Sequence, residues 1–293
     1  MPRLALVTLN VRGLGDTKGF AKLLQLLQRL KKKHEIGVMC IQEHNLNPNR
    51  DEDIQTMSKI AGFTAVTTYG RADAPDSQRG GVMTLITDSL LTVKNTVIAE
   101  PGVIILDVEW GAKQLTVGNV YAPAQPLGRI DFFNWLRRNI PDDTYIGGDW
   151  NCVPDTTLDV DSNNPLGYKN TGISILNDII VSKKIIDERR EQLGDEKEFT
   201  RSGAHAGGIT SSRIDRWYIP IEHDYLITFD TDNQFIFKEI SSDHRAVIMK
   251  IDDKAGTRGN ERDSLDEALT NRRPKHTRRN KKNSRNRVLV REI

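Results

Sequence analysis

The sequence of 293 residues has only two cysteines, Cys40 and Cys152, which lack CxxC spacing and histidine companions. Neither a disulfide framework nor a zinc site is therefore expected, and a reducing compartment fits. Long hydrophobic runs are also missing, because Ile36–Ile41 and Val103–Leu106 are strand-sized, whereas a membrane helix needs roughly 18 apolar residues. The apolar start, Met1–Val7, ends before it reaches signal-peptide length. We expect a soluble protein of the nucleus or cytoplasm, not secreted and with no membrane partner.

The net charge of +2 hides an uneven distribution of charge along the chain. Asn271–Ile293 holds ten Lys or Arg and one acid, which leaves 32 basic and 39 acidic residues in the rest. This excess of acidic residues argues against broad, non-specific binding of nucleic acid. It suits a pocket of carboxylates that recruits a divalent metal. Because apolar residues become rare from about Asp252, we predict a folded domain over 1–252 and a basic, disordered tail or linker over 253–293.

Hydrophobic spacing predicts a mixed α/β protein. Helical spacing marks Thr17–Lys33, Asp51–Ala61, Arg129–Asn139 and Thr171–Lys183. Strand-like runs are Leu4–Leu9, Ile36–Gln42, Phe63–Thr68, Gly80–Ile86, Leu91–Ile98, Val103–Trp110, Gln114–Tyr121, Thr144–Gly148, Arg213–Ile219, Tyr225–Phe229 and Arg245–Ile251. No helix is expected between the strands Leu91–Ile98, Val103–Trp110 and Gln114–Tyr121. Such a run indicates antiparallel pairing and disfavours a simple doubly wound parallel sheet. Two mixed β-sheets packed face to face, with helices outside, fit this order best.

Polar side chains gather where the predicted strands begin or end, which is where mixed-sheet proteins collect function. These clusters are Asn10, Gln42 with Glu43, Asn119 to Tyr121, Asp149 to Asn151, and Ser242 to His244. Taken singly, each has an ordinary explanation, since an acid after a strand is usually a turn residue or helix cap. A lone histidine is more often a partly buried structural residue than a catalyst. The combination and its order carry the functional signal.

Six ordered motifs resemble those of the endonuclease/exonuclease/phosphatase superfamily, over Leu4–Ile251. They are Leu9-Asn10, Gln42-Glu43, Asn119-Val120-Tyr121-Ala122-Pro123, Gly148-Asp149-Trp150-Asn151, Ser212-Arg213-Ile214-Asp215 and Ser242-Asp243-His244. The resemblance implies an α/β fold, a four-layered sandwich of two mixed sheets flanked by helices, like deoxyribonuclease I. It also implies a metal-dependent phosphodiesterase.

The resemblance implies oxygen ligands for a divalent metal. Glu43, with Asn10 as ligand or orienter, would hold Mg²⁺, with Mn²⁺ as the alternative, and Asp243 is a second candidate metal carboxylate. Asp149 would act as base or orienter for the attacking water, and Asn151 would hold substrate or ligand geometry.

The resemblance also implies donors to the phosphate. Tyr121 would offer its hydroxyl to the phosphate or the leaving group. His244 would donate to a phosphate oxygen, kept in the correct tautomer and charged by Asp215. The spacing of the sequence alone does not pair these last two residues.

Within the superfamily, several segments resemble the endonuclease domains of non-long-terminal-repeat retrotransposons. They are Gln78 to Val82, Tyr121 to Pro123 and Ser212 to Asp215, with Arg79, Ser212 and Arg213 as candidate DNA contacts. Arg12 stands where abasic-site repair enzymes usually have an acid, which also favours this branch. The ordinary alternative for Arg79 and the two glycines after it is a tight turn.

Two residues depart from the pattern and put the level of activity and the preferred DNA geometry in doubt. Ala124 stands where relatives commonly have an asparagine, and Arg201 stands where an aromatic residue is frequent. The basic tail fits a linker to a downstream reverse transcriptase domain, or equally a nuclear-import signal.

We therefore predict a DNA-nicking endonuclease that leaves a 3′-hydroxyl. The alternatives are an abasic-site repair endonuclease, a phosphatase or lipase of the same fold, and a non-catalytic nucleic-acid-binding remnant.

Overall fold

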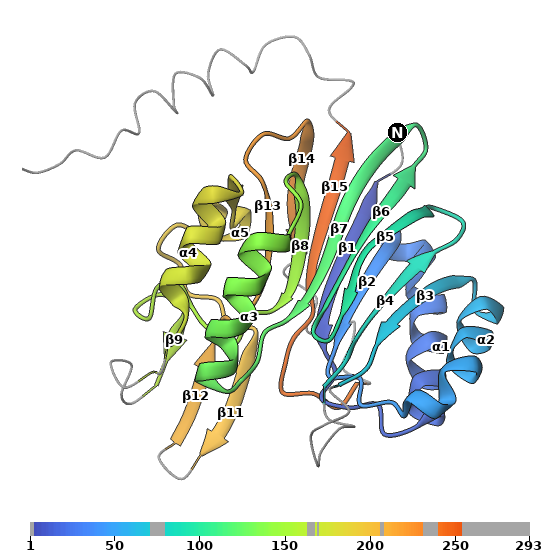
Figure 1. Ribbon diagram of the computed structural model, residues 1–293, viewed down its shortest axis with the longest axis horizontal. Helices are drawn as coiled ribbons and strands as arrows, with labels where there is room; N and C mark the ends of the chain where they lie inside the picture. The colour runs from blue at the N-terminus through green and yellow to red at the C-terminus, as the bar shows by residue number, and fades with distance from the viewer. Residues whose placement is uncertain are drawn as a thin grey trace, which may run out of the picture. The chain divides into compact units, whose positions relative to one another are not determined.

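Two six-stranded mixed β-sheets form the centre of the protein (Figure 1). The first contains, in spatial order, β14 (Tyr225–Asp230), β15 (Val247–Asp253), β1 (Leu4–Asn10), β2 (Ile36–Gln42), β4 (Val82–Thr87) and β3 (Phe63–Thr68). The second contains β10 (Ile185–Ile186), β13 (Asp215–Pro220), β8 (Thr144–Asp149), β7 (Lys113–Tyr121), β6 (Val103–Trp110) and β5 (Thr92–Glu100). Each sheet has one parallel pair, β1 with β2 and β7 with β8, and its other pairs are antiparallel.

The computed structural model describes residues 3–70, 80–162, 168, 170–205, 208–230 and 240–253. These residues belong to one unit, which ends at Asp253. Arg79 and the predicted tail after Asp253 lie outside the described residues, so both stay predictions. In the part that is described, no helix has the length and apolar character needed to cross a membrane.

Helices cover the outer face of each sheet and complete four layers (Figure 1). The helices α1 (Thr17–His34) and α2 (Asp51–Ile60) pack on the first sheet. In the chain, α2 is followed directly by β3. The helices α3 (Pro126–Asn139) and α4 (Ile173–Ser182) pack on the second sheet. A 3₁₀ turn at Pro48–Arg50 precedes α2, and a short helix, α5 (Glu188–Leu193), follows β10.

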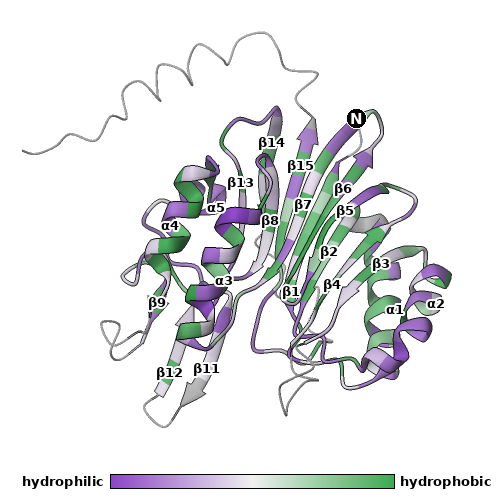
Figure 2. Ribbon diagram, in the orientation of Figure 1, coloured by the Kyte–Doolittle hydropathy of each residue, from purple (hydrophilic) through white to green (hydrophobic). Residues whose placement is uncertain are grey.

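The apolar strands explain the layering, because the central ones are buried on both faces. In β1, Ala5, Val7 and Leu9 face α1, whereas Leu4 and Leu6 face the second sheet. A strand covered on both sides reads as a continuous hydrophobic run rather than an alternating one. Figure 2 shows these hydrophobic strands between helices whose surfaces are mixed.

The structure has a small third sheet that the sequence analysis did not predict. It consists of β11 (Arg201–His205), β12 (Gly208–Ser212) and β9 (Val160–Asp161). Its strands are short and rich in polar residues and glycine, so they have no hydrophobic alternation to recognise. It lies beside the second sheet (Figure 1) and supplies Arg201 to the region discussed below.

Several predicted boundaries are wrong by two or three residues. The strand expected from Gly80 begins at Val82, because Gly80 and Gly81 have φ values of 105° and 82°, which a strand cannot continue. The strand expected from Arg213 begins at Asp215. The helix expected from Arg129 begins at Pro126, where proline suits the first turn.

Two buried amides link the sheets next to the polar edge. Gln42 Nε2 donates to Asn119 Oδ1 at 2.8 Å and to Thr8 Oγ1 at 2.9 Å. Asn119 Nδ2 has three acceptors within 3.3 Å, the Met83 and Ile41 carbonyls and Thr84 Oγ1. Because both amides are buried, this network holds β2 and β7 in one relative position.

We expect Asn119→Ala to lower the free energy of unfolding by about 3 kcal/mol, because it leaves one N–H of the buried Gln42 amide without an acceptor, while the other still donates to Thr8, and because it opens a small cavity. Urea unfolding followed by circular dichroism measures this loss. Asn139→Ala is the control, since it removes one exposed side-chain hydrogen bond to Trp135 O and should cost about 0.5 kcal/mol or less. Equal losses for the two variants would contradict the linking role.

Candidate active site

Strand pairing brings the predicted site residues to one edge of the two sheets. Asn10 lies opposite Gln42, at the ends of the parallel strands β1 and β2. Tyr121 lies opposite Asp149 at the ends of β7 and β8, and Asp215 lies opposite Asp149 on its other side. Parallel strands end at the same edge, so residues more than a hundred positions apart in sequence become neighbours.

Asn10 joins two carboxylates. Its Nδ2 donates to Glu43 Oε1 at 2.7 Å and to Asp149 Oδ2 at 2.9 Å, while its Oδ1 accepts from the Arg12 amide at 3.0 Å. Glu43 follows β2 with φ 52°, an uncommon value for a residue with a side chain. The two carboxylates and the amide offer only oxygen atoms to a cation, which is the donor set that Mg²⁺ and Mn²⁺ prefer.

Asp149 is buried and has an unusual protonation equilibrium. Burial, followed by repulsion from Asp215, raises the pKa of Asp149 to about 7, although the hydrogen bond from Asn10 opposes the rise. The Asn151 amide nitrogen also donates to Asp149 Oδ1 at 2.9 Å. Burial and the charges of Glu43 and Asp149 likewise raise the pKa of Tyr121, so its phenol stays protonated and remains a donor.

His244 and Asp215 form the opposite side of the site. His244 Nδ1 lies 2.9 Å from Asp215 Oδ2 and 3.0 Å from Oδ1. Burial lowers the pKa of His244, but attraction to Asp215 and their hydrogen bond outweigh burial and raise the pKa to about 9. The histidine is therefore charged at neutral pH. The predicted pairing of these two residues has a geometry that supports it.

Thr200 is a site residue that the motifs did not reveal. Its hydroxyl donates to Asp215 Oδ2 at 2.6 Å, so the carboxylate has both a hydroxyl and an imidazole as partners. Thr200 lies between α5 and β11, beside Arg201, and its position in the sequence assigned it no role. Its distance from Asp215 identifies it. Ser242 has a similar supporting role, since its hydroxyl donates to Asn10 O at 2.7 Å and accepts from the His244 amide at 3.1 Å.

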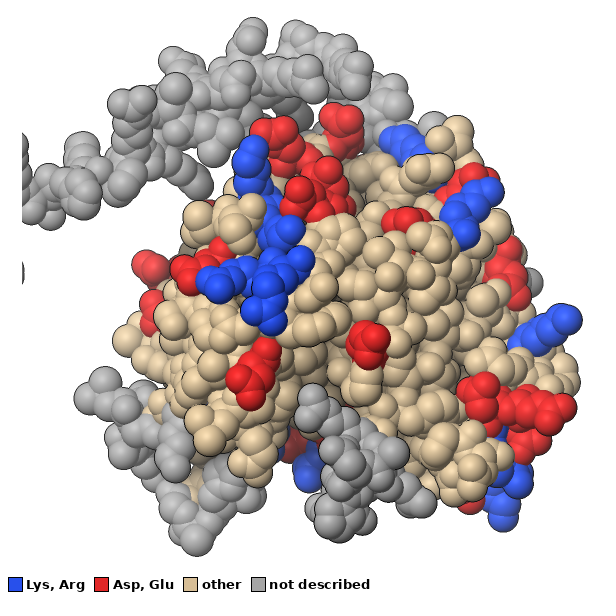
Figure 3. Space-filling model, in the orientation of Figure 1, with Lys and Arg blue, Asp and Glu red and all other residues tan. Residues whose placement is uncertain are grey.

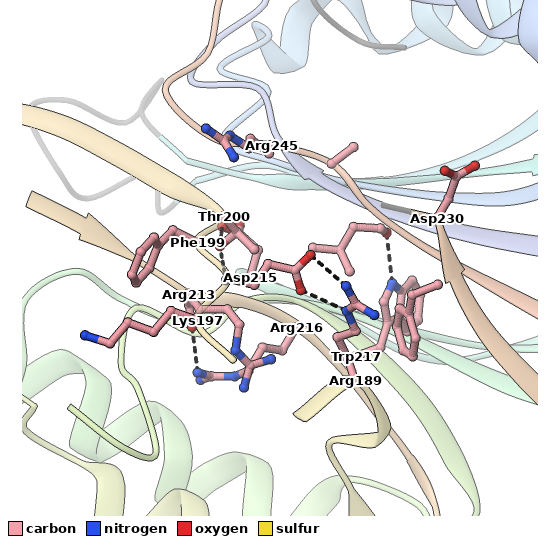
Figure 4. A pocket seen from close by; sticks show the side chains of 14 residues that line it. Arg189, Lys197, Phe199, Thr200, Arg213, Asp215, Arg216, Trp217, Asp230 and Arg245 are labelled. Carbon is pink, nitrogen blue, oxygen red and sulfur yellow. Dashed lines mark hydrogen bonds and ion pairs between the residues drawn. The ribbon is translucent and has the colours of Figure 1, made fainter. Parts of the chain in front are cut away.

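A pocket of about 260 Å³ lies next to Thr200 and Asp215, which form part of its wall (Figure 4). Trp217 and Arg189 line it further, and Arg189 forms a two-point ion pair with Glu198 at 2.8 and 3.1 Å. The Asp215 carboxylate is buried and is held by hydrogen bonds to Thr200 and His244.

Asp243, expected as a second metal carboxylate, is engaged elsewhere. Its Oδ2 accepts from Arg12 and from Arg201, each at 3.1 Å. Its Oδ1 lies 3.7 Å from His244 Nε2. Among the described residues, one group of three has ligand atoms close enough to share a metal ion, namely Asp149, Asp215 and His244, within 4.8 Å of one another. Asp243 is outside that group, and Asp215 is already used by His244.

Arg213 and Ser212 do not face outward as DNA contacts would. The Arg213 side chain is 2% exposed, and its guanidinium pairs with Asp159 at 2.7 Å and with Asp187 at 2.6 Å. Ser212 is buried as well. This burial argues against the expected DNA contacts and gives Arg213 a structural role. Asn151 also turns its amide inward, donating to Ala122 O at 2.8 Å.

Lysine and arginine gather on the face of the second sheet's helices (Figure 3). Arg137 and Arg138 end α3, and Lys183 follows α4. Since α3 runs back from the end of β7 to the start of β8, these cations lie at the opposite end of the sheet from Asp149. They complement helix C-termini and are not part of the site.

The sequence profile of the endonuclease/exonuclease/phosphatase family matches residues 7–244. The chain belongs to this family. The predicted resemblance is thereby confirmed. The four-layered sandwich fold is confirmed as well, because solved structures similar to this chain share that fold. A curated relative, the transposon TX1 uncharacterized 149 kDa protein of Xenopus laevis, is 33% identical over 146 residues. That alignment covers 47% of this chain and 11% of the relative, so the chain spans about a tenth of that protein's length.

Solved structures with the same fold include proteins of at least three kinds. The AP endonuclease of Leishmania major has a TM-score of 0.66 at 13% identity, covering 85% of this chain and 87% of that one. The endonuclease domain of TRAS1, a telomere-specific non-LTR retrotransposon, has a TM-score of 0.54 at 15% identity, covering 85% and 98%. TDP2 of D. rerio, complexed with a single-strand DNA product, has a TM-score of 0.54 at 15% identity, covering 86% and 100%.

Proposed function

We propose that the protein is a metal-dependent endonuclease that nicks one strand of DNA and leaves a 3′-hydroxyl. The observation that carries this proposal is that Asn10 joins Glu43 and Asp149, opposite the charged His244–Asp215 pair. Phosphodiester hydrolysis needs both halves: carboxylates that hold a cation and position water, and donors that stabilise charge on the phosphate.

The proposed roles combine the family resemblance with the contacts of each residue. Glu43 and Asn10 would hold Mg²⁺, with Mn²⁺ as the alternative, and the bound ion would supply Lewis-acid stabilisation of a phosphate oxygen. Asp149 accepts a proton from the attacking water, a task that suits a pKa near neutrality. His244 donates to a non-bridging phosphate oxygen, and Tyr121 donates to the phosphate or the departing 3′ oxygen.

Nicking of supercoiled plasmid in Mg²⁺, with and without a chelator, tests the proposal. We expect relaxed circles that carry one break per molecule and can be extended by a polymerase from a 3′-hydroxyl, and we expect the chelator to abolish them. A folded protein that nicks in neither Mg²⁺ nor Mn²⁺ would be a non-catalytic binding remnant instead.

The intact duplex is the proposed substrate, rather than an abasic site. The similarity to the TX1 transposon protein and to the TRAS1 domain supports this reading, as does Arg12, which stands where abasic-site repair enzymes usually have an acid. The likeness to the Leishmania AP endonuclease keeps abasic-site repair as the second candidate.

We expect undamaged duplex to be nicked with a modest preference for flexible pyrimidine–purine steps, because their deformation costs less. An oligonucleotide with one tetrahydrofuran abasic analogue should be cut no more than about tenfold faster than its undamaged counterpart of equal sequence, a margin of about 1.4 kcal/mol. Cleavage confined to the abasic oligonucleotide would establish the repair function.

We also propose that this domain belongs to a longer retroelement protein that has a reverse transcriptase downstream and acts on nuclear DNA. The share of the TX1 protein that the chain covers, 11%, supports this. Reading the transcript beyond the codon for Ile293 tests it, and a stop codon without any reverse transcriptase sequence downstream would contradict it.

A further inference from the structure

Two arginines from distant segments meet on one carboxylate beside the catalytic histidine. Arg12 lies in the turn after β1, and Arg201 is the first residue of β11. Arg12 Nη1 and Arg201 Nε each lie 3.1 Å from Asp243 Oδ2. We call these three side chains the arginine fork.

The backbone ties the fork to His244. Arg201 forms a bridge with His244, and the Ser202 amide donates to Asp243 O at 3.1 Å. The charge of Arg201 also reaches Tyr121, where it opposes the rise in pKa that burial and Glu43 cause. The site therefore has a carboxylate half, Glu43 with Asp149, and a cationic half made of the fork and His244.

The fork has more positive charge than an ion pair would need for neutrality. Two guanidinium groups share one carboxylate oxygen, and their side chains are 53% and 36% exposed. Each guanidinium has five N–H donors, and the contact to Asp243 uses one of them in each arginine. Exposed ion pairs contribute about 0–1 kcal/mol to stability, so stability alone does not explain the arrangement. Arg12 also has φ 50°, a sparsely populated conformation of the kind found at functional sites.

We propose that Asp243 holds Arg12 and Arg201 as a fork that binds a DNA backbone phosphate adjacent to the scissile phosphate. This inference rests on the proposed function, since it assigns a substrate contact at the same site. Guanidinium groups bind phosphate through paired N–H donors, and anchoring by Asp243 limits the side-chain entropy lost on binding. This contact holds the DNA backbone in place beside the scissile phosphate.

The first test is the salt dependence of DNA binding. Each phosphate contact contributes about 0.9 to the slope of log affinity against log salt, so Arg12→Gln with Arg201→Gln, which removes the contact to one phosphate, should lower the slope by about one. The full chain with Asp149→Asn is used as the parent so that the duplex stays intact during anisotropy measurements. Arg50→Gln is the matched control, because Arg50 is 57% exposed and pairs with Asp53 at 2.7 Å. Slopes that match the control would overturn the fork.

The second test uses Asp243→Ala. It distinguishes whether Asp243 positions the two arginines or affects DNA binding only through its negative charge. Removing a negative charge should strengthen DNA binding if only overall electrostatics matter. The fork predicts the opposite, a three- to tenfold weakening, roughly that expected for partial loss of one charge-assisted contact. Asp243→Asn is the second variant if the alanine variant does not fold. Tighter binding by the folded variant would overturn the anchoring role.

The third test locates the phosphate. Methylphosphonates placed singly along the cleaved strand each remove one charge, and one position should weaken binding by the parent but not by the double arginine variant. Equal effects in both proteins at every position would overturn the inference. These measurements need no cleavage, so a protein that never nicks plasmid contradicts the proposed function, whereas unchanged salt slopes and methylphosphonate effects contradict only the fork.

Discussion

Replacing Asp149 by asparagine is expected to lower the rate of DNA nicking by at least about a hundredfold, or about 2.7 kcal/mol or more in transition-state stabilisation. The carboxylate accepts from Asn10 Nδ2 at 2.9 Å and from the Asn151 amide at 2.9 Å. An amide in its place cannot accept a proton from water, and it cannot balance the charge of a bound cation. Glu43→Ala and His244→Ala should each lower the rate by a similar factor, because they remove a metal ligand and a phosphate donor.

Single-turnover nicking at saturating protein measures the loss for Asp149→Asn without interference from binding. Asp142→Asn is a suitable control, since Asp142 is exposed and pairs with Lys183 at 3.0 Å, far from the site. Circular dichroism and thermal melting establish that each variant is folded. If folded Asp149→Asn nicks at the parent rate, Asp149 is not the water-activating group.

Replacing Asp215 by asparagine is expected to make nicking strongly dependent on pH. In the parent, the Asp215 carboxylate raises the pKa of His244 to about 9, so the charged donor is lost only as pH rises through about 9. Without that carboxylate, burial still lowers the pKa of His244 and only the smaller attractions of Asp149 and Asp243 raise it, so the pKa falls toward its ordinary value of 6.5. At pH 8 the charged fraction then falls from about nine-tenths to about three-hundredths, whereas at pH 6 it changes little. The variant should therefore lose about twentyfold more activity at pH 8 than at pH 6.

A pH series of nicking rates from 5.5 to 9 measures the effect on activity, and NMR titration of the histidine rings measures the pKa directly. His44 is an internal control. Burial lowers its pKa to about 4, and its ring contacts Thr68 O rather than a carboxylate. An unchanged pKa of His244 in the variant would show that Asp215 only positions the ring, and a uniform loss of activity at all pH values would agree with that outcome.

Much of the fold was accessible from the sequence because the central strands are buried on both faces. Runs such as Leu4–Leu9 and Val103–Trp110 have strand length and unbroken hydrophobic character, and the structure has strands over both. The third sheet was not accessible, because polar strands such as β11 form only when neighbouring segments supply their hydrogen-bond partners. Boundaries were missed where backbone conformation rather than hydrophobicity ends an element, as at Gly80.

Candidate site residues were recognisable for a different reason. Asn10, Glu43, Asp149 and His244 stand next to strand ends in an order typical of the family, so local sequence identifies them without any distances. Thr200, which acts through Asp215, has no such signal. Thr200 became visible only because its hydroxyl lies 2.6 Å from Asp215.

The sequence by itself determined the family, the two mixed sheets and the identity of the polar residues at the strand ends, since these depend on local composition and order along the chain. Only the tertiary structure decided how those residues are used. It placed Arg213 in the interior, where two carboxylates neutralise it, and it placed Arg12 and Arg201 on the Asp243 carboxylate. The physical reason is that a charged side chain is used according to its partner and its exposure to water, and for residues far apart in the chain both are set by packing.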